Sequence, residues 1–398
     1  LAMFVLFVLA ACQPQQAPLP TEASIVITQT AIAIESQTPT PTPTNTPLTL
    51  PPTFTPTFTA TATPTPDFTP TPEGFSESGT LFYIYNDDAI ASVRGDGSNN
   101  QIALTFGVGQ RLSDLQPSPD EELLAFVGPQ GAARDVFVTS RDGSFLQRIS
   151  CLGFSDVRRP QWSPDGTFLT FYAAPNATLP GDIYRANLEG ASDCPSNNQR
   201  LFVDLDTTTY GGAAWSDDGN LLFYAADNGI MALDVRDGQR QPISEPSPLG
   251  PDYMPRANPA NESLGFLQSR RDPQTQRVTG SLVVIEQPSV IPEDLLFRRG
   301  VESLSRAFRW RADGAEALLI AEDALFIREI ERGIVEEIAR DLEMPTADYG
   351  PDARFIVYSA PDANGVPQLF SYDRRRERVM QLTQNPEGTI SDVHWLAG

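Results

Sequence analysis

The stretch "PQWSPDGTFLTFYAA" (residues 160–174) decides the fold, because versions of it recur along the chain. In each version a marker residue, Trp162 here, leads into a turn, and an apolar strand-like run follows. Related stretches begin at Leu115, Ala213, Pro255, Phe308 and Ala347. The marker positions are Pro117, Trp162, Trp215, Ala257, Trp310 and Tyr349, spaced 39 to 53 residues apart. This spacing is typical of repeat proteins, and it outweighs the two-domain division that 398 residues would otherwise suggest.

Each copy carries signals for four strands. Two apolar runs follow the marker turn, and a Gly-containing turn such as "RDGS" (residues 141–144) precedes a last short strand. Asp-Gly between strand-like runs is a strong hairpin signal, because the turn needs positive φ. Four strands in a repeat of this length predict the blade of a β-propeller. Residues 327–343 have a helix-like pattern, but Gly333 and their place in the repeat favour strands.

The two ends of the repeat region complete one another. Residues 80–105 supply the second, third and fourth strands of a unit, and residues 390–398 supply a first strand with Trp395 at the marker position. We therefore predict an all-β propeller of seven four-stranded blades, closed by the C-terminal strand. Closure would remove exposed sheet edges. The alternative is six blades, if the weak unit at residues 253–299 is not one.

The repeats resemble those of the TolB C-terminal propeller and of related WD40-like (PD40) periplasmic repeats. The resemblance rests on "WSPDG" (162–166), "FYAA" (171–174) and "IYRANLEG" (183–190), and it extends over residues 79–398. It implies a module that binds a protein or a peptide. We predict a non-catalytic binding or scaffolding module for a protein, a peptide or a glycan. The N-terminal αβ domain of TolB has no counterpart here, so a role in the Tol system is not implied.

The N-terminal segment predicts export. "LAMFVLFVLAAC" (residues 1–12) is an apolar run of signal-peptide length, too short to span a bilayer. Its last four residues resemble the bacterial lipobox, which implies lipidation of Cys12; the alternative is an ordinary signal peptide. We expect residues 1–11 to be a signal peptide lacking its first residues. The mature protein would then be anchored to the cell membrane by lipid, on the extracytoplasmic side.

Residues 12–78 are rich in Thr and Pro, notably from Thr38 to Gly74. Such a segment cannot bury enough apolar surface to offset the entropy of ordering, and alternating Thr-Pro favours an extended chain. We therefore expect a disordered stalk between the lipid anchor and the propeller at residues 79–398.

Composition excludes several classes of partner and chemistry. The formal charge is −23, from 28 basic and 51 acidic residues, which argues against a nucleic-acid partner. One histidine, His394, and three cysteines leave few ways to build a zinc site or a His-based triad. We predict no catalytic residue, no metal and no cofactor, and a monomer. The rival class is a cell-envelope hydrolase or lyase that uses the propeller channel.

Most of the conspicuous motifs have structural interpretations. The Asp-Gly turns recur in several copies, as an active site would not, and "RGDG" (94–97) occupies a hairpin-turn position. A single histidine such as His394 is most often a packed residue. Cys151 and Cys194 lie in loops of consecutive units, and either a disulfide or two free thiols fits the sequence.

The candidate binding site is the mouth of the central channel, which the loops entering each first strand should form. The residues expected there are Asp114, Asp156, Arg158, Arg159, Tyr210, Tyr253, Arg306 and Asp392. A second candidate is "QSRRDPQTQRVTGS" (residues 268–281), an Arg-containing hairpin loop in an acidic protein.

Overall fold

The computed structural model divides the chain into two units, Leu1–Ala62 and Thr63–Gly398. It describes residues 79–107, 109–188, 194, 199–205, 212–226, 229–286 and 305–397, all in the second unit. The predicted signal peptide (1–11), the lipidation site Cys12 and the predicted stalk (12–78) lie outside the described residues. So does Tyr210.

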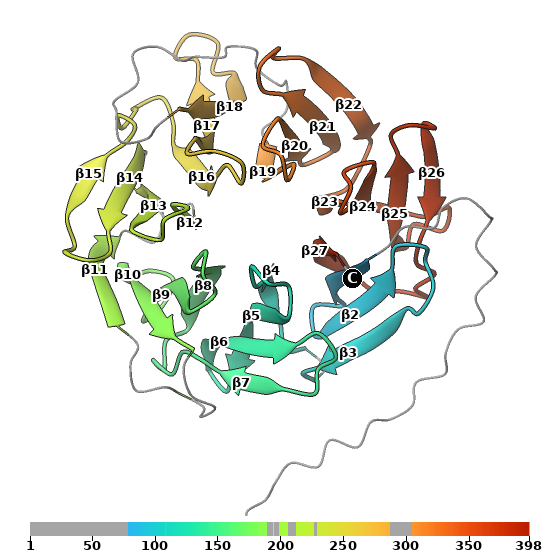
Figure 1. Cartoon of the computed structure of the whole chain (residues 1–398), viewed down its shortest axis with the longest axis horizontal. Helices are drawn as coiled ribbons and strands as arrows, with labels where there is room; N and C mark the ends of the chain where they lie inside the picture. Colours follow the sequence, from blue (N-terminus) through green and yellow to red (C-terminus); the bar gives the residue numbers. More distant parts are fainter. Residues whose placement is uncertain are drawn as a thin grey trace, which may run out of the picture. The chain divides into compact units, whose positions relative to one another are not determined.

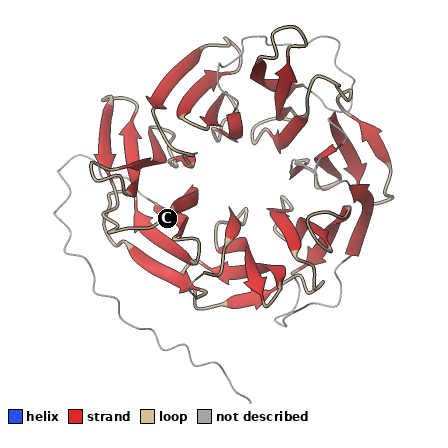
Figure 2. Cartoon of the chain, turned by 180° about the vertical axis from the view of Figure 1, so that it is seen from behind, coloured by secondary structure: helices blue, strands red, loops and turns tan. Residues whose placement is uncertain are grey.

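The described residues form seven antiparallel sheets arranged in a ring (Figures 1 and 2). The sheet that holds both ends of the propeller contains β27 (Ile390–Leu396), β1 (Thr80–Tyr85), β2 (Ala89–Arg94) and β3 (Gln101–Thr105). The next two contain β4 (Ser113–Pro117), β5 (Leu123–Gln130), β6 (Ala133–Ser140) and β7 (Leu146–Arg148), then β8 (Asp156–Trp162), β9 (Phe168–Ala174), β10 (Gly181–Asn187) and β11 (Gln199–Leu205). The fourth and fifth contain β12 (Ala213–Trp215), β13 (Leu221–Ala226), β14 (Gly229–Asp234) and β15 (Arg240–Pro242), then β16 (Asp252–Ala257), β17 (Leu264–Arg271) and β18 (Val278–Ile285). The last two contain β19 (Ser305–Trp310), β20 (Glu316–Ala321), β21 (Ala324–Glu329) and β22 (Val335–Arg340), then β23 (Ala347–Tyr349), β24 (Phe355–Pro361), β25 (Pro367–Asp373) and β26 (Arg378–Gln381).

Seven sheets confirm the seven-bladed prediction, and the six-bladed alternative is wrong. Six sheets have four strands, and the weak unit has three within the described residues, which leave out 287–304. Residues 327–343, where a helix-like pattern competed with strands, form parts of β21 and β22. Among the described residues no helix is both long and apolar enough to cross a membrane.

The C-terminal strand closes the ring, as predicted. β27 pairs with β1, Trp395 opposite Leu81 and His394 opposite Phe82, and the C-terminal end of the chain lies within this blade (Figure 1). Val393 is fully buried in a core cluster that draws on both this blade and the blade of β24. The closing strand therefore contributes backbone pairing to one blade and apolar packing to its neighbour.

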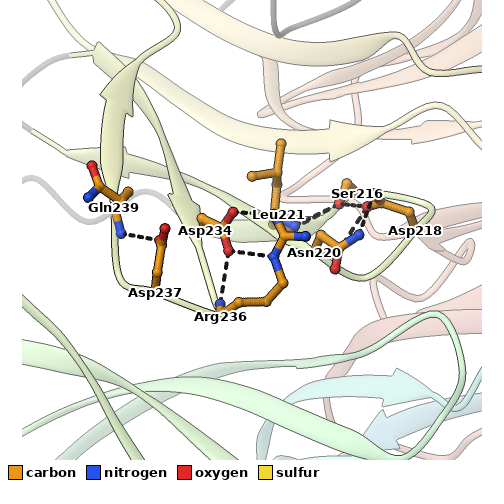
Figure 3. Close-up of polar contacts among 8 residues, drawn as sticks. All are labelled: Ser216, Asp218, Asn220, Leu221, Asp234, Arg236, Asp237 and Gln239. Carbon is orange, nitrogen blue, oxygen red and sulfur yellow. Dashed lines mark hydrogen bonds and ion pairs between the residues drawn. The ribbon is translucent and has the colours of Figure 1, made fainter.

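The marker turns form small hydrogen-bonded units. In the turn after Trp162, Asp165 accepts hydrogen bonds from the Ser163 hydroxyl (2.6 Å) and the Thr167 amide (3.1 Å), and Gly166 has φ of 72°. Figure 3 shows the same arrangement in the next blade, where Asp218 accepts from the Ser216 hydroxyl. The equivalent carboxylates are Asp120, Asp165, Asp218, Asp313 and Asp352. These side chains hold turns, in agreement with the structural interpretation of the motif.

The marker tryptophans also tie neighbouring blades together. The Trp162 indole N–H donates to the backbone oxygen of Gln116 at 3.1 Å, and that of Trp310 donates to the backbone oxygen of Arg256 at 3.1 Å. Each acceptor is the residue immediately before the marker of the preceding blade. Most of the apolar clusters likewise draw side chains from two consecutive blades.

Two motifs singled out in the sequence lie in hairpins. "RGDG" forms the start of the connection between β2 and β3, with Gly97 at φ 82°. The predicted loop at 268–281 is mostly paired strand, because β17 and β18 pair as far as Arg271 and Val278. Its Arg270 pairs with Asp252 at 2.5 Å, so this arginine of the predicted hairpin is held against the blade.

Candidate functional site in the central channel

A cavity of about 660 Å³ occupies one end of the channel. It is formed where the innermost strands begin, whereas the marker turns lie at the other ends of those strands. Its volume falls in the range of small-ligand sites, roughly 300–1,000 Å³. Side chains of β4, β8, β16, β19 and β27 line it, together with residues 343–346 and the hairpin between β24 and β25.

Four innermost strands present a strained residue to this cavity. Three positions before the marker, φ is 58° at Asp114, 54° at Arg159, 54° at Met254 and 49° at Asp392. At each of these places the pairing with the second strand of the blade shifts register, which marks a β-bulge. A bulge redirects a side chain, and left-handed φ is unfavourable for a residue with a Cβ. The same strained conformation recurs in four blades, and all four residues face one cavity. This ring of bulge residues is therefore a candidate site.

A second ring consists of the residues one position before each marker. Because side chains alternate between the two faces of a strand, these side chains point in the same general direction as those of the bulge residues. Its members are Gln116, Gln161, Ala214, Arg256, Arg309, Asp348 and His394. Both glutamines and both arginines line the cavity. The sequence analysis named only His394 from this ring, although counting back one residue from each marker would have found the others.

Backbone amides hold two of the three acidic side chains of the two rings, and the third, Asp114, accepts from the Ser113 hydroxyl at 3.0 Å. Asp392 accepts from the amide of Asp114 at 2.7 Å, and Asp348 accepts from the amides of Tyr349 (2.9 Å) and Trp395 (3.1 Å). Burial, and then the nearby charge of Asp114, raise the pKa of Asp392 to about 6. Burial also raises the pKa of Asp348, against the opposing effect of Arg309.

His394 is a buried and hydrogen-bonded member of this network. Its Nε2 lies 2.7 Å from the backbone oxygen of Leu115, which makes Nε2 the protonated nitrogen. Arg309 Nη2 lies 3.3 Å from the same nitrogen. Burial and the charges of Arg309 and Arg256 lower the pKa of His394 well below its ordinary value. The histidine is therefore neutral at neutral pH.

The arginines of the second ring have spare donors. Within the described part of the chain, Nε of Arg256 and Nε of Arg309 are buried without a hydrogen-bond partner, and neither guanidinium has a carboxylate within 4.0 Å. Burial, then the charges of Arg309 and Arg159, lower the pKa of Arg256 to about 9. The channel thus combines acids that are held by amides with arginines that keep donors available.

The structure separates the seven predicted mouth residues that it describes into two groups. Asp114, Arg159, Arg306 and Asp392 line the cavity. Arg158 instead forms a bidentate pair with Asp156 at 2.5 Å, and the Tyr253 hydroxyl donates to the backbone oxygen of Ser305 at 2.8 Å. These three side chains stabilise the blades, and Tyr210 lies outside the described residues.

Cys151 and Cys194 are joined by a disulfide, with 5.4 Å between their Cα atoms. The bond connects the segment between β7 and β8 to the segment between β10 and β11, away from the cavity residues. In the described ranges, no group of three His, Cys, Asp or Glu side chains is placed to hold a metal ion.

No protein-family profile and no curated protein matches this sequence. Solved structures do match. TolB from Acinetobacter baumannii is 14% identical with a TM-score of 0.48, and the match covers 80% of this chain and 66% of that one. A structure from a study of two prolyl endopeptidases is 14% identical with a TM-score of 0.52, covering 79% and 49%. Oligogalacturonate lyase from Vibrio parahaemolyticus is 13% identical with a TM-score of 0.50, covering 77% and 86%.

These similarities concern architecture, since unrelated functions share the propeller fold. The chain spans about half the length of the prolyl endopeptidase and 66% of the TolB chain. The described part of the chain is a seven-bladed β-propeller, and proteins with TolB, prolyl endopeptidase and oligogalacturonate lyase names are among its structural neighbours.

Proposed function

We propose that this protein is an exported, non-catalytic binding module whose ligand, part of a protein, a peptide or a glycan, enters the channel at the 660 Å³ cavity. The observation that carries the proposal is the ring of four strained bulge residues facing that cavity. Strain of this kind persists where the surrounding structure is built to maintain it, and it clusters at functional sites.

An extracytoplasmic location belongs to the same proposal. The disulfide between Cys151 and Cys194 is of the kind that persists in oxidising compartments. The signal-peptide-like run and the lipobox-like "LAAC" before the Thr/Pro-rich segment favour a lipid-anchored protein displayed on a stalk.

Obstruction of the cavity tests the proposed site. The full chain is used as bait for cell-envelope components, alongside Thr389→Trp at the cavity rim and Ala312→Trp on an exposed marker turn at the other end of the channel. We expect wild type and Ala312→Trp to capture the same component, and Thr389→Trp to lose it. Equal capture by all three would contradict the proposed site, and turnover of an envelope substrate without stable capture would favour the hydrolase or lyase alternative.

A further inference from the structure

The charged groups of the channel differ in whether they have hydrogen-bond partners. Backbone amides already hold the carboxylates of Asp392 and Asp348. In contrast, the Nε–H groups of Arg256 and Arg309 are buried without acceptors in the described part of the chain. A buried donor without an acceptor destabilises the folded state, and more so when it is charged. An incoming acceptor would remove that cost.

The arginines are also close enough to influence one another. The charges of Arg309 and Arg159 both disfavour the protonated form of Arg256. All three line the same cavity, from β16, β19 and β8. Like charges held together in a partly dry cavity favour a bound anion, and planar guanidinium groups match the two oxygens of a carboxylate.

The remaining lining residues indicate what the anion is attached to. Around the arginines lie Met254, Met344, Pro345, Pro361 and Ile320, and Met344 is 54% exposed. Flexible methionines are suited to peptide side chains of varied shape. No described residue that lines the cavity is aromatic, so a flat ring on which a sugar could stack is missing from this part of the wall.

We propose that Arg256 and Arg309, assisted by Arg159, bind a carboxylate of a peptide that enters the channel. This proposal rests on the proposed binding function and specifies its ligand chemistry. Capture of a carboxylate by protein donors is a recurring mode of peptide recognition. Gln116 and Gln161, on the same ring, supply further donors to the cavity wall.

The test compares matched short peptides, with and without the charge. The probes are acetyl-Ala-Ala-Ala with a free C-terminal carboxylate, its C-terminal amide, and the pair acetyl-Ala-Glu-Ala-amide and acetyl-Ala-Gln-Ala-amide. D-galacturonate serves as a sugar carboxylate. Binding to the full chain is measured by ligand-observed NMR and calorimetry at millimolar concentrations. We expect at least one carboxylate peptide to bind at least tenfold more tightly than its amide partner.

Variants assign that preference to the arginines. Arg256→Gln and Arg309→Gln should each weaken carboxylate binding at least tenfold while leaving amide binding unchanged. Arg236→Gln, which removes an exposed arginine paired with Asp234 (Figure 3), is the matched control and should bind as wild type does. Arg256→Gln should also melt no lower than wild type, because the side chain it removes leaves no carboxylate partner behind.

Four outcomes would overturn the inference. These are equal binding of acids and amides, unchanged binding in both arginine variants, binding of galacturonate in preference to every peptide, and failure of all the probes to bind. If these tests fail while Thr389→Trp still abolishes capture, the carboxylate assignment is wrong and the proposed binding function stands.

Discussion

At the scale of single residues, burial in the channel shifts the pKa values of acidic and basic side chains in opposite directions. Burial raises the pKa of Asp392 to about 6 and lowers that of Arg256 to about 9, so each is nearer to neutrality than it would be in water. Both lie in the wall of one cavity. A fold selected for stability alone would place apolar side chains at these positions.

Asp392 gives the first prediction, a pH-dependent stability. Its folded pKa of about 6 is above the unfolded value of about 3.9, so the folded chain retains this proton longer. The contribution of Asp392 to the free energy of unfolding therefore falls as pH rises from about 4 to about 6. Above that range this contribution does not change further. Asp392→Asn should raise the free energy of unfolding at pH 7.5 by about 3 kcal/mol and leave it nearly unchanged at pH 4.

Thermal melts at the two pH values measure this effect. Glu245→Gln, at an exposed position, is the control and should melt as wild type does at both. A lower melting temperature for Asp392→Asn at pH 7.5 would show that the ionised carboxylate stabilises the channel, contrary to the prediction.

At the scale of structural elements, the marker turn accepts different residues at the position of Gly166. Gly219 and Gly314 occupy it in two other blades with φ of 68° and 69°. Glu121 and Ala353 adopt the same left-handed conformation, at 61° and 55°, in two more. The turn hydrogen bonds thus enforce a conformation that costs a residue with a Cβ about 1–2 kcal/mol.

Replacement of Ala353 by Gly should therefore stabilise the protein. The gain from relieved backbone strain exceeds the added entropy of the unfolded chain, and we expect about 0.5–1 kcal/mol in the free energy of unfolding. Ala312→Gly, in the neighbouring blade's turn but without positive φ, is the control and should destabilise the protein by a similar amount. Urea unfolding of both variants measures the difference, and shifts of the same sign would refute the strain argument.

The closing strand β27 is the element whose removal should have the largest effect. It pairs along β1 and buries Val393 and Trp395, which are 0% and 5% exposed. Truncation before Ile390 would expose an unpaired edge of β1 and an apolar surface. We expect the truncated chain to aggregate or to lose its cooperative unfolding transition, as measured by size-exclusion chromatography and circular dichroism. A stable truncated monomer would mean that closure is not needed.

At the scale of the whole molecule, the disulfide joins the connection between two blades (β7 to β8) to a connection within the second of them (β10 to β11). The two cysteines are 43 residues apart in sequence, and closing such a loop in the unfolded chain corresponds to about 4 kcal/mol in the chain-entropy account. Reduction, or Cys151→Ser with Cys194→Ser, should lower the melting temperature by several degrees without removing the ring. Melts with and without reductant test this, and the double serine variant should be insensitive to reductant. An unchanged wild-type melt on reduction would contradict the prediction.

Much of this architecture was predictable because it repeats. Local sequence preferences that all blades share made the fold predictable. They are the period of the "WSPDG"-like turns, the hairpin turns, and the unmatched first strand at residues 390–398. Local chemistry is weakest in the unit beginning near Tyr253, where Ala260 and Asn261 replace the Asp and Gly of the turn. There two asparagines hold the turn instead: Asn258 accepts from the Ala260 amide at 3.0 Å, and Asn261 accepts from the Ser263 amide at 2.8 Å.

The candidate site was only half predictable, for a physical reason. Asp114 and Arg159 line the cavity, where the repeat pattern placed the channel mouth. Asp156 and Tyr253 do not line it, because they pair with Arg158 and with the Ser305 backbone, and such partners depend on packing. By itself the sequence determined an all-β propeller and which strand closes it, since periodicity and turn chemistry are local, and the structure decided for seven blades over six. Tertiary structure alone decided which charges face one another across the channel and which keep unused donors, because burial and ion pairing depend on strands that are far apart in the chain.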